Sequence, residues 1–371
     1  MTNRERALAV LHYRSYDRMP LVHFGFWGET LQRWCNEGHV TAAEIAGVGD
    51  NSPAEHTLET KLGFDFNWQT MFYSNTGLRP GFTERVIESL PDGSRKVLNG
   101  CGMIVQLQDG AGSIPAEVDH LLKTRKDWEE HYLPRLQWTE ERVDLKALKQ
   151  LRTQGPGDRP LGLHCGSLFG DIRNWVGVAG ASYLYADDPD LYKDIIDTVG
   201  ELCYRCVALA LQHGGPFDFA HFWEDICFKN GPLVIPSVFA ELVGPHYHRI
   251  TDLTRQHGLN ICSLDCDGKI DALIPTWLHN GVNTMFPIEV GTWDASIEPW
   301  RKQYGRELRG VGGMNKTVFS RDRAAVDREI ERLRRLVDLG GFIPCPDHRL
   351  APDTQWDNLR YYCDRMHQVY G

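Results

Sequence analysis

The regular alternation of strand-like and helix-like segments from residue 160 onward is the feature that most limits how this chain can fold. Amphipathic stretches separate short apolar runs, and two of these stretches carry clear helix signals at 187–213 and 325–339, each ending in a pair of glycines. Repeated β-then-α units predict a mainly parallel sheet. The strand-like runs are 161–168, 217–223, 259–264, 284–288, 308–312 and 342–344.

An apolar run at residues 21–27 adds a seventh strand and favours a closed (β/α)₈ barrel. We expect the eighth strand between residues 63 and 153, where the pattern is weak. A doubly wound open sheet is the alternative, but no strand is followed by a G-x-G-x-x-G turn and the chain has no P-loop. The sequence therefore predicts a single TIM-type α/β barrel over residues 1–371.

Short alternating segments between about residues 82 and 114 interrupt this pattern. Segments 84–89 and 94–98 flank Pro91-Asp92-Gly93, a hairpin signature, and a third segment follows at 102–108. About thirty residues are too few to bury a core alone. We therefore expect a small β insertion in the N-terminal third of the barrel and no second domain.

Charge and cysteine content exclude several classes of protein. The net charge of −10 disfavours a nucleic-acid partner, because phosphate binding needs a basic surface. No run of about 18 apolar residues is present to span a membrane, and the first 18 residues lack the apolar block of a signal peptide. The ten cysteines are scattered along the chain. We therefore expect a cytoplasmic protein with reduced thiols.

Ionisable and aromatic side chains follow nearly every predicted strand. In a (β/α)₈ barrel the reactive groups gather where strands end, so this convergence predicts a site more firmly than any one residue does. The candidates are His23, Trp27, His164, Trp223, Glu224, Asp265, Asp267, Glu289, Lys316, His348 and Arg349.

Asp265-x-Asp267 is the sharpest pair among these candidates. Alternate residues on a strand point the same way, so both carboxylates can face one point. Two close carboxylates either hold a cation or raise one pKa for acid–base work. The alternative is structural, with Asp267-Gly268 forming a turn and Asp265 capping the next helix.

The other candidates also have structural alternatives. Of Glu224 and Asp225, one is expected to be a loop acid and the other a cap, and Asp225 is the better candidate for the cap. His348 either packs in the core or reacts, and its place directly after a strand favours reaction. His164 with Cys165 either binds a metal or packs, with packing favoured. Trp27 and Trp223 either line a pocket for a flat ligand or belong to the core.

Several short fragments of this sequence occur in an order and spacing typical of one family. They are Asn3-Arg4-Glu5-Arg6-Ala7-Leu8-Ala9 with Asp17-Arg18-Met19-Pro20, Tyr185-Ala186-Asp187-Asp188-Pro189, Asn230-Gly231-Pro232, Gly281-Val282-Asn283 with Pro287-Ile288-Glu289, and Gly340-Gly341-Phe342-Ile343. In these fragments the chain resembles the uroporphyrinogen decarboxylase superfamily, which also contains corrinoid-dependent methyltransferases. The resemblance spans nearly the whole length and implies a (β/α)₈ barrel.

The resemblance is nearer to the methyltransferase branch than to true porphyrinogen decarboxylases. The decarboxylases carry an arginine-containing segment after the first strand, whereas residues 23–28 here contain no arginine to pair substrate carboxylates. The methyltransferase branch binds zinc through His-x-Cys and a later Cys, and the matching positions here are Asp265, Asp267 and His348. This harder set implies a different metal, a weaker zinc site, or direct hydrogen bonds to substrate.

The first hypothesis is therefore a methyltransferase or demethylase that moves a methyl group from a small, methoxylated substrate to a cobalamin cofactor or a corrinoid protein. Asp265, Asp267 and His348 would bind zinc or another divalent metal, and Glu224, Asp265 or His348 would act in catalysis. His23, Trp27, His164, Trp223, Glu289, Lys316 and Arg349 would contact substrate or cofactor. The alternatives are a decarboxylase or lyase of a small carboxylated substrate and a non-catalytic binding protein. A homo-oligomer is compatible with each.

Overall fold

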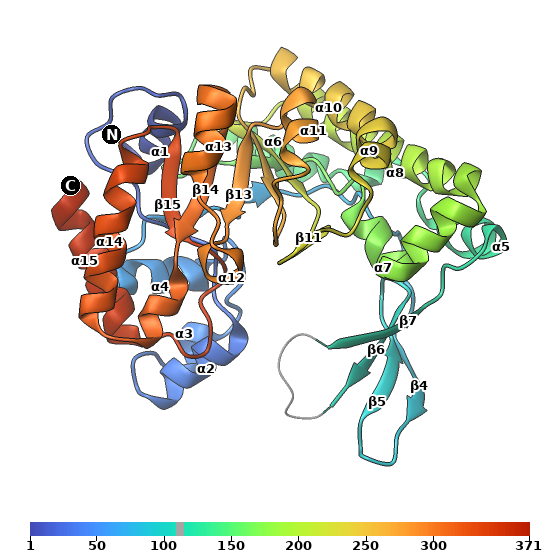
Figure 1. Cartoon of the computed structure of the whole chain (residues 1–371), viewed down its shortest axis with the longest axis horizontal. Coiled ribbons are helices and arrows are strands. Elements are labelled where there is room, and N and C mark those ends of the chain that lie inside the picture. Colours follow the sequence, from blue (N-terminus) through green and yellow to red (C-terminus); the bar gives the residue numbers. More distant parts are fainter. Residues whose placement is uncertain (109–114) are drawn as a thin grey trace.

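A barrel of parallel strands forms the centre of the computed structural model, which describes residues 1–108 and 115–371 (Figure 1). Seven strands form one sheet in the order β15-β14-β13-β12-β9-β8-β3, and every pair in it is parallel. The predicted α/β barrel is thereby confirmed. The seven strands are β3 (Met71–Phe72), β8 (Gly162–His164), β9 (Phe219–Trp223), β12 (Cys262–Asp265), β13 (Thr284–Ile288), β14 (Arg309–Met314) and β15 (Phe342–Pro346).

Two short segments near the N-terminus complete the barrel. β1 (Val22–His23) pairs in parallel with β2 (Phe66–Asn67), and β3 follows β2 after three residues and pairs with β8. β2 and β3 are thus two pieces of one strand, which lies within the region where the sequence predicted the eighth strand. The barrel closes where Phe26 bridges Leu350 in parallel and the Leu350 amide donates to the Gly25 carbonyl at 3.0 Å.

The first strand is shorter than its apolar run predicts. β1 covers only residues 22–23 of the expected 21–27, because Gly25 turns the chain with φ at +86°. A side chain at this position would be strained by the backbone, and its Cβ would also overlap the Arg349 guanidinium. This turn brings Trp27 back over the end of the barrel.

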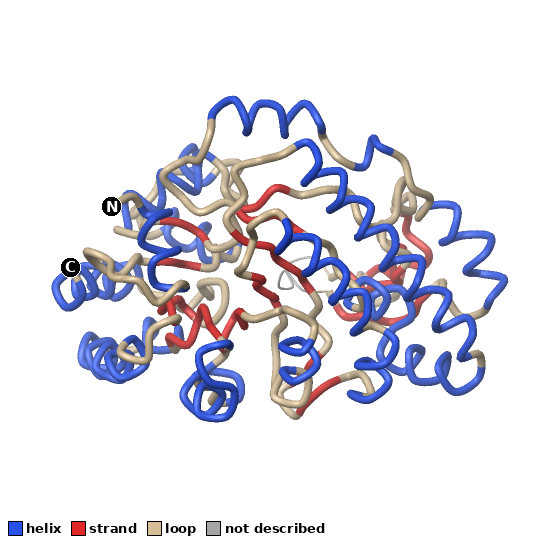
Figure 2. Tube along the Cα trace, turned by 90° about the horizontal axis from the view of Figure 1, so that it is seen from above, coloured by secondary structure: helices blue, strands red, loops and turns tan. Residues whose placement is uncertain are grey.

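Helices surround the strands on the outside of the barrel (Figure 2). Local signals define their ends. Asp188 caps α8 by accepting from the Leu191 amide, Pro189 occupies the first turn, and the helix ends before Gly214. The helices are α1 (Asn3–Leu11), α2 (Gly28–Asn36), α3 (Ala42–Ile45), α4 (Pro53–Leu62), α5 (Arg125–Asp127), α6 (Leu145–Gln154), α7 (Gly170–Asp187), α8 (Pro189–His213), α9 (Pro236–Leu242), α10 (Gly244–Gln256), α11 (Ile274–His279), α12 (Val290–Trp293), α13 (Ile297–Tyr304), α14 (Arg323–Val337) and α15 (Trp356–Tyr370). None of the helices in the described ranges has the length and apolar character needed to cross a membrane.

Aromatic rings fill the inside of the barrel. Trp68 stacks on Phe219 with ring centres 4.6 Å apart, and Phe24 packs against Phe286 at 4.5 Å. The Trp68 indole donates to the Ser263 hydroxyl at 3.2 Å, so its buried N–H is satisfied. The barrel is therefore a packed core, and a ligand has room only beyond these rings, toward the ends of the strands.

A four-stranded antiparallel sheet, here called the arm, projects from the barrel beside α7 (Figure 1). The arm consists of β4 (Arg85–Ser89), β5 (Arg95–Leu98), β6 (Met103–Leu107) and β7 (Ala116–His120). The first three strands coincide with the three segments expected from sequence. β7 was not expected, because the segment Ala-Glu-Val-Asp-His has little apolar alternation. The expected end of the insertion at residue 114 lies outside the described residues, and the assignment of the chain to one domain stays a prediction.

Candidate active site at the strand ends

A cavity of about 350 Å³ opens at the carboxyl ends of the barrel strands. Its walls come from β1, β3, β8, β9, β12 and β15 and from the loops that follow them. The lining residues are Phe24, Trp27, Asp50, Gln69, Tyr73, His164, His221, Trp223, Asp225, Asp265, Asp267, His348 and Arg349. Seven of the site residues predicted from the sequence therefore line this cavity. They are Trp27, His164, Trp223, Asp265, Asp267, His348 and Arg349.

Three aspartates form the most concentrated charge in this cavity. Asp265 ends β12, Asp267 follows it, and Asp225 comes just after β9. Each offers a carboxylate oxygen within 4.8 Å of the other two. The alternation expected for Asp265 and Asp267 is thus seen, and both side chains face the same space. The third member, Asp225, was expected to be a structural cap.

His348 contacts this carboxylate cluster from the loop that follows β15. Its Nε2 lies 3.1 Å from Asp267 Oδ2, and its ring stacks on Trp27 with centres 5.7 Å apart and planes at 16°. The other atoms of the pair, Asp267 Oδ1 and His348 Nδ1, are buried and have no partner among the described residues. Buried polar atoms without partners are costly, so this pair is a candidate for contact with a ligand.

Burial and mutual repulsion disfavour three negative charges in the carboxylate cluster. Burial, together with the neighbouring aspartates, raises the pKa of Asp265 well above its usual range. Burial and the charge of Asp267 raise the pKa of Asp225 to about 7. Gln69 stabilises Asp265 through an Nε2 to Oδ2 hydrogen bond of 2.7 Å. The cluster therefore needs either protons or a cation to balance it.

The guanidinium of Arg349 is already neutralised within the cavity. It forms two hydrogen bonds to Asp50, from Nη1 to Oδ1 at 2.9 Å and from Nη2 to Oδ2 at 2.6 Å. This bidentate geometry pairs the charge of the guanidinium with that of Asp50. Arg349 thus lines the site, as expected, with its charge already paired inside the protein.

Glu224 lies outside the cavity, contrary to its expected catalytic role. Its side chain is fully buried and accepts hydrogen bonds from the hydroxyls of Ser167 and Tyr247 and from three backbone amides at the start of α7. All of its acceptor capacity is used inside the protein. At this position it is the neighbouring Asp225, and not Glu224, that lines the cavity.

Three other residues that were expected to contact a ligand instead form hydrogen bonds within the protein, outside the cavity. His23 is buried, and its Nε2 lies 3.0 Å from Glu59 Oε1. Glu289 accepts from the Gly268 amide at 2.5 Å and so holds the turn after Asp267. The Lys316 ammonium donates to the Arg349 carbonyl at 3.1 Å. None of the three lines the cavity, so the structure departs from the expectation that they touch a ligand.

Asp171 in the first turn of α7 is a second carboxyl group with an altered pKa. Burial and the nearby Glu224 raise the pKa of Asp171 to about 7. An unfolded chain releases this proton near pH 4, whereas the folded protein keeps it until about pH 7. The unfolded state therefore binds fewer protons in this range, and the contribution of Asp171 to stability falls as pH rises from 4 to 7.

We expect Asp171→Asn to raise the melting temperature at pH 8 and to have little effect at pH 4.5. The amide has no charge to bury, so the gain should appear as pH rises through this range. Calorimetry at both pH values measures it, with the exposed Asp364→Asn as the control. An equal shift at the two pH values would contradict the assignment.

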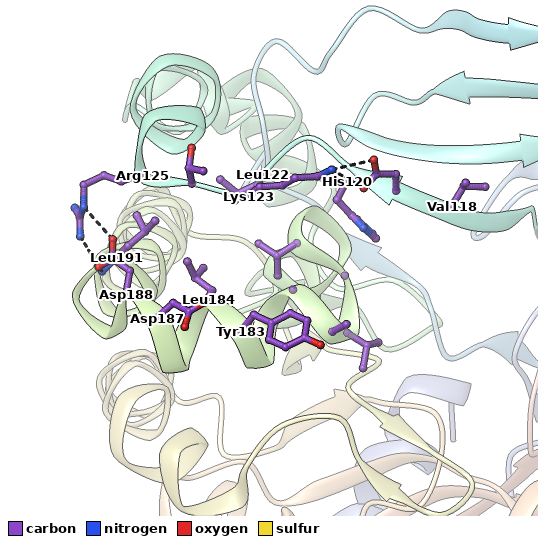
Figure 3. Close-up of a pocket in the computed structure, with 17 residues that line it drawn as sticks. Val118, His120, Leu122, Lys123, Arg125, Tyr183, Leu184, Asp187, Asp188 and Leu191 are labelled. Atoms are coloured by element: carbon purple, nitrogen blue, oxygen red, sulfur yellow. Dashed lines mark hydrogen bonds and ion pairs between the residues drawn. The ribbon is translucent and has the colours of Figure 1, made fainter.

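A larger cavity of about 690 Å³ lies between the arm and α7 (Figure 3). Its walls are mainly apolar and include Val118, Leu122, Tyr183 and Leu184. α7 is kinked here at Gly177, whose φ is +72° and whose position leaves space for the His120 ring. Its described lining residues include no group of carboxylates or imidazoles comparable to the cluster of Asp225, Asp265 and Asp267, and we therefore place the candidate active site at the strand ends.

Comparison with known proteins identifies the family of this chain. The uroporphyrinogen decarboxylase (URO-D) family model matches residues 96–369. The chain belongs to the uroporphyrinogen decarboxylase family. None of the curated proteins matches it.

Two solved structures show the same fold as this member of the uroporphyrinogen decarboxylase family. A methyltransferase from Methanosarcina mazei is 17% identical, with full coverage of both chains and a TM-score of 0.64. A B12-independent methionine synthase from Shewanella sp. W3-18-1 is 10% identical, with 95% of this chain and 98% of that chain covered and a TM-score of 0.51. The family and both of these solved structures carry the names of enzymes.

Proposed function

We propose that this protein is a methyltransferase that takes a methyl group from a small substrate and transfers it to a corrinoid acceptor. The observation that carries the proposal is the carboxylate cluster of Asp225, Asp265 and Asp267 with His348 beside it, in a cavity at the strand ends. The family and the methyltransferase neighbours support a role in methyl transfer or decarboxylation.

The donor atoms of the cluster fit a hard divalent cation. Three carboxylates supply oxygen ligands, and Asp267 Oδ1 is buried without a partner in the described part of the chain. Oxygen donors suit Mg²⁺ or Mn²⁺ better than a thiolate-preferring zinc. The neighbouring cysteines, Cys266 and Cys345, are fully buried and do not line the cavity. A bound cation would polarise a substrate oxygen.

The cavity fits a small substrate by volume, at about 350 Å³. We therefore propose that the corrinoid arrives as a second substrate on a partner protein. The substrate loses its methyl group as the carbon–oxygen bond breaks, and the oxygen keeps the electron pair and takes a proton. The methyl carbon bonds to cobalt through the electron pair of cob(I)alamin. His348, oriented by Asp267 and by stacking on Trp27, is the residue proposed to supply the proton.

Decarboxylation is the second candidate function, and the charges in the cavity disfavour it. The arginine that lines the cavity, Arg349, is paired with Asp50, and Arg173 is engaged by Glu117 and the Asp225 carbonyl. Among the described residues that line the cavity, a carboxylated substrate would therefore meet the three aspartates of the cluster and an arginine whose charge is already paired. A purely structural barrel is also disfavoured, because gathering three carboxylates around the buried Asp265 costs stability and is typical of a functional site.

Incubation of the protein with Mn²⁺, cob(I)alamin and a panel of methoxylated donors tests the proposal. We expect methylcobalamin to form, followed by its absorbance spectrum, and the demethylated alcohol or phenol to appear in equal amount. Release of carbon dioxide from carboxylated compounds, without methylcobalamin from any donor, would support the decarboxylase instead.

A further inference from the structure

Two histidines on neighbouring strands lie deeper in the cavity than the carboxylate cluster. His164 on β8 and His221 on β9 are paired in the strand register, with ring centres 6.1 Å apart, and both line the cavity. On β9, His221 comes two residues before Trp223, which pairs with Asp265. Because the strands run toward the opening of the cavity, the histidine pair forms its floor and the aspartates form its rim.

Both rings of this floor are uncharged at neutral pH. Burial lowers the pKa of His164 to about 4, and burial with the nearby His164 lowers the pKa of His221 well below its usual range. The Gly166 amide donates to His164 Nδ1 at 3.2 Å, so the proton of His164 is on Nε2. His164 is therefore a hydrogen-bond donor toward the cavity.

His221 has unused hydrogen-bonding capacity. Its side chain is 1% exposed, and its Nδ1 is buried without a partner in the part of the chain that the structure describes. The rings around it, Phe219 and Phe286, offer no oxygen or nitrogen. A buried imidazole nitrogen without a partner is costly, and a ligand in the cavity can complete the hydrogen bonds of this ring.

The walls between floor and rim are aromatic. Phe24, Trp27, Tyr73 and Trp223 line the cavity, and the Tyr73 ring packs on His164 with centres 4.7 Å apart. Such walls favour a flat ring. A neutral histidine pair offers both a donor and an acceptor, which matches a hydroxyl group, since a hydroxyl donates one hydrogen bond and accepts others.

We propose that His164 and His221 bind an uncharged hydroxyl group of an aromatic substrate at the end remote from the methyl group that is transferred. This inference rests on the proposed methyltransferase function and names its substrate class, a hydroxylated aromatic methyl ether. The hydroxyl binds the floor, the ring lies between the aromatic walls, and the methoxyl oxygen lies at the rim beside the carboxylate cluster. An anionic substituent is disfavoured at the floor, because both histidines there are uncharged and Arg349, the cation among the described lining residues, is paired with Asp50.

Calorimetric titration of the Mn²⁺-loaded protein without any corrinoid tests the floor by itself. The ligands are 4-methoxyphenol, anisole, which lacks the hydroxyl, and 4-methoxybenzoate, which carries a charge in its place. We expect 4-methoxyphenol to bind wild type about tenfold more tightly than anisole, the effect of roughly one buried hydrogen-bonded pair. We expect 4-methoxybenzoate to bind more weakly than either.

His221→Phe should raise the Kd of 4-methoxyphenol to that of anisole and leave the Kd of anisole unchanged. His221→Gln, which keeps a donor and an acceptor, should recover part of the difference. His257→Phe, at an exposed histidine, is the matched control and should behave as wild type. Thermal unfolding checks that each variant folds, and His164→Phe gives the same test if His221→Phe does not.

Three results would overturn the inference: binding of 4-methoxyphenol to His221→Phe as tight as to wild type, preference of wild type for the benzoate, or no binding of any of these rings. The outcome is separate from that of the proposed function. Tight, histidine-dependent binding without methyl transfer to cob(I)alamin would support the hydroxyl-binding role of the two histidines and reject the methyltransferase function. Methyl transfer that is unaffected by His221→Phe would support the methyltransferase function and reject the hydroxyl-binding role.

Discussion

Asp267→Ala is expected to prevent the proposed binding of a divalent cation and to lower the proposed methyl transfer to cob(I)alamin by at least about 100-fold. Asp267 supplies one of the three carboxylates of the cluster, and its other oxygen orients His348. The variant therefore loses a cation ligand and the hydrogen bond to His348 together. Metal analysis of the dialysed protein and the rate of methylcobalamin formation measure the two losses.

The control for this experiment is the exposed Asp364→Ala, which should keep both the cation and the rate. Mn²⁺ should also raise the melting temperature of wild type and of the control but not that of Asp267→Ala, because a ligand stabilises only the protein that binds it. A full complement of cation in Asp267→Ala would show that the cluster is not a metal site.

Glu224→Ala is expected to lower the free energy of unfolding by roughly 3–6 kcal/mol, because it leaves several buried donors without an acceptor. These donors are the amides of Leu168, Phe169 and Gly170 and the hydroxyl of Tyr247. Urea unfolding followed by circular dichroism measures the change. Glu224→Gln should lose less, since the amide oxygen still accepts.

Glu201→Ala is the matched control for the loss of a glutamate. Glu201 pairs with Arg249 at the surface and is 53% exposed, so its removal should change stability by less than about 1 kcal/mol. A small effect of Glu224→Ala on stability, combined with a complete loss of turnover, would instead restore the catalytic role that the sequence suggested.

The barrel was predictable because its signals are local and repeated. Buried strands such as β13 (Thr284–Ile288) are continuous apolar runs, and α8 has a capping aspartate, a proline in its first turn and a terminal glycine. The split strand was harder to place, because β2 and β3 have two residues each and their pairing depends on partners distant in sequence. Tertiary contacts define that strand, and periodicity does not.

The alternation of side chains along a strand predicted part of the candidate site on β12. The same alternation on β9 points to residues other than the predicted Glu224. Alternation placed Asp265 and Asp267 on one side of β12. The same rule on β9 directs Phe219, His221, Trp223 and then Asp225 inward, whereas Phe222 and Glu224 face Tyr247 of α10. Counting in twos from Trp223 would have selected Asp225 and His221 in place of Glu224.

The pairing of Arg349 and the position of His23 could not be deduced from sequence in this way. Asp50 lies in a loop 299 residues before Arg349, and no local pattern links the two. His23 belongs to the first strand, but the turn at Gly25 directs its ring to Glu59 inside the protein. Ion pairs between loops depend on the closed fold, so they become visible only once the barrel is built.

The closure of the barrel by β1 against the segment after β15 gives ligand binding a further effect. Trp27 stacks on His348, Asp50 holds Arg349, and the Gly25 carbonyl accepts from the Leu350 amide, so the cavity wall is assembled from both ends of the chain. A cation or substrate bound in this cavity would contact residues from both ends of the chain and so stabilise their association. Its supply would therefore govern how often they separate and how long the protein escapes proteolysis.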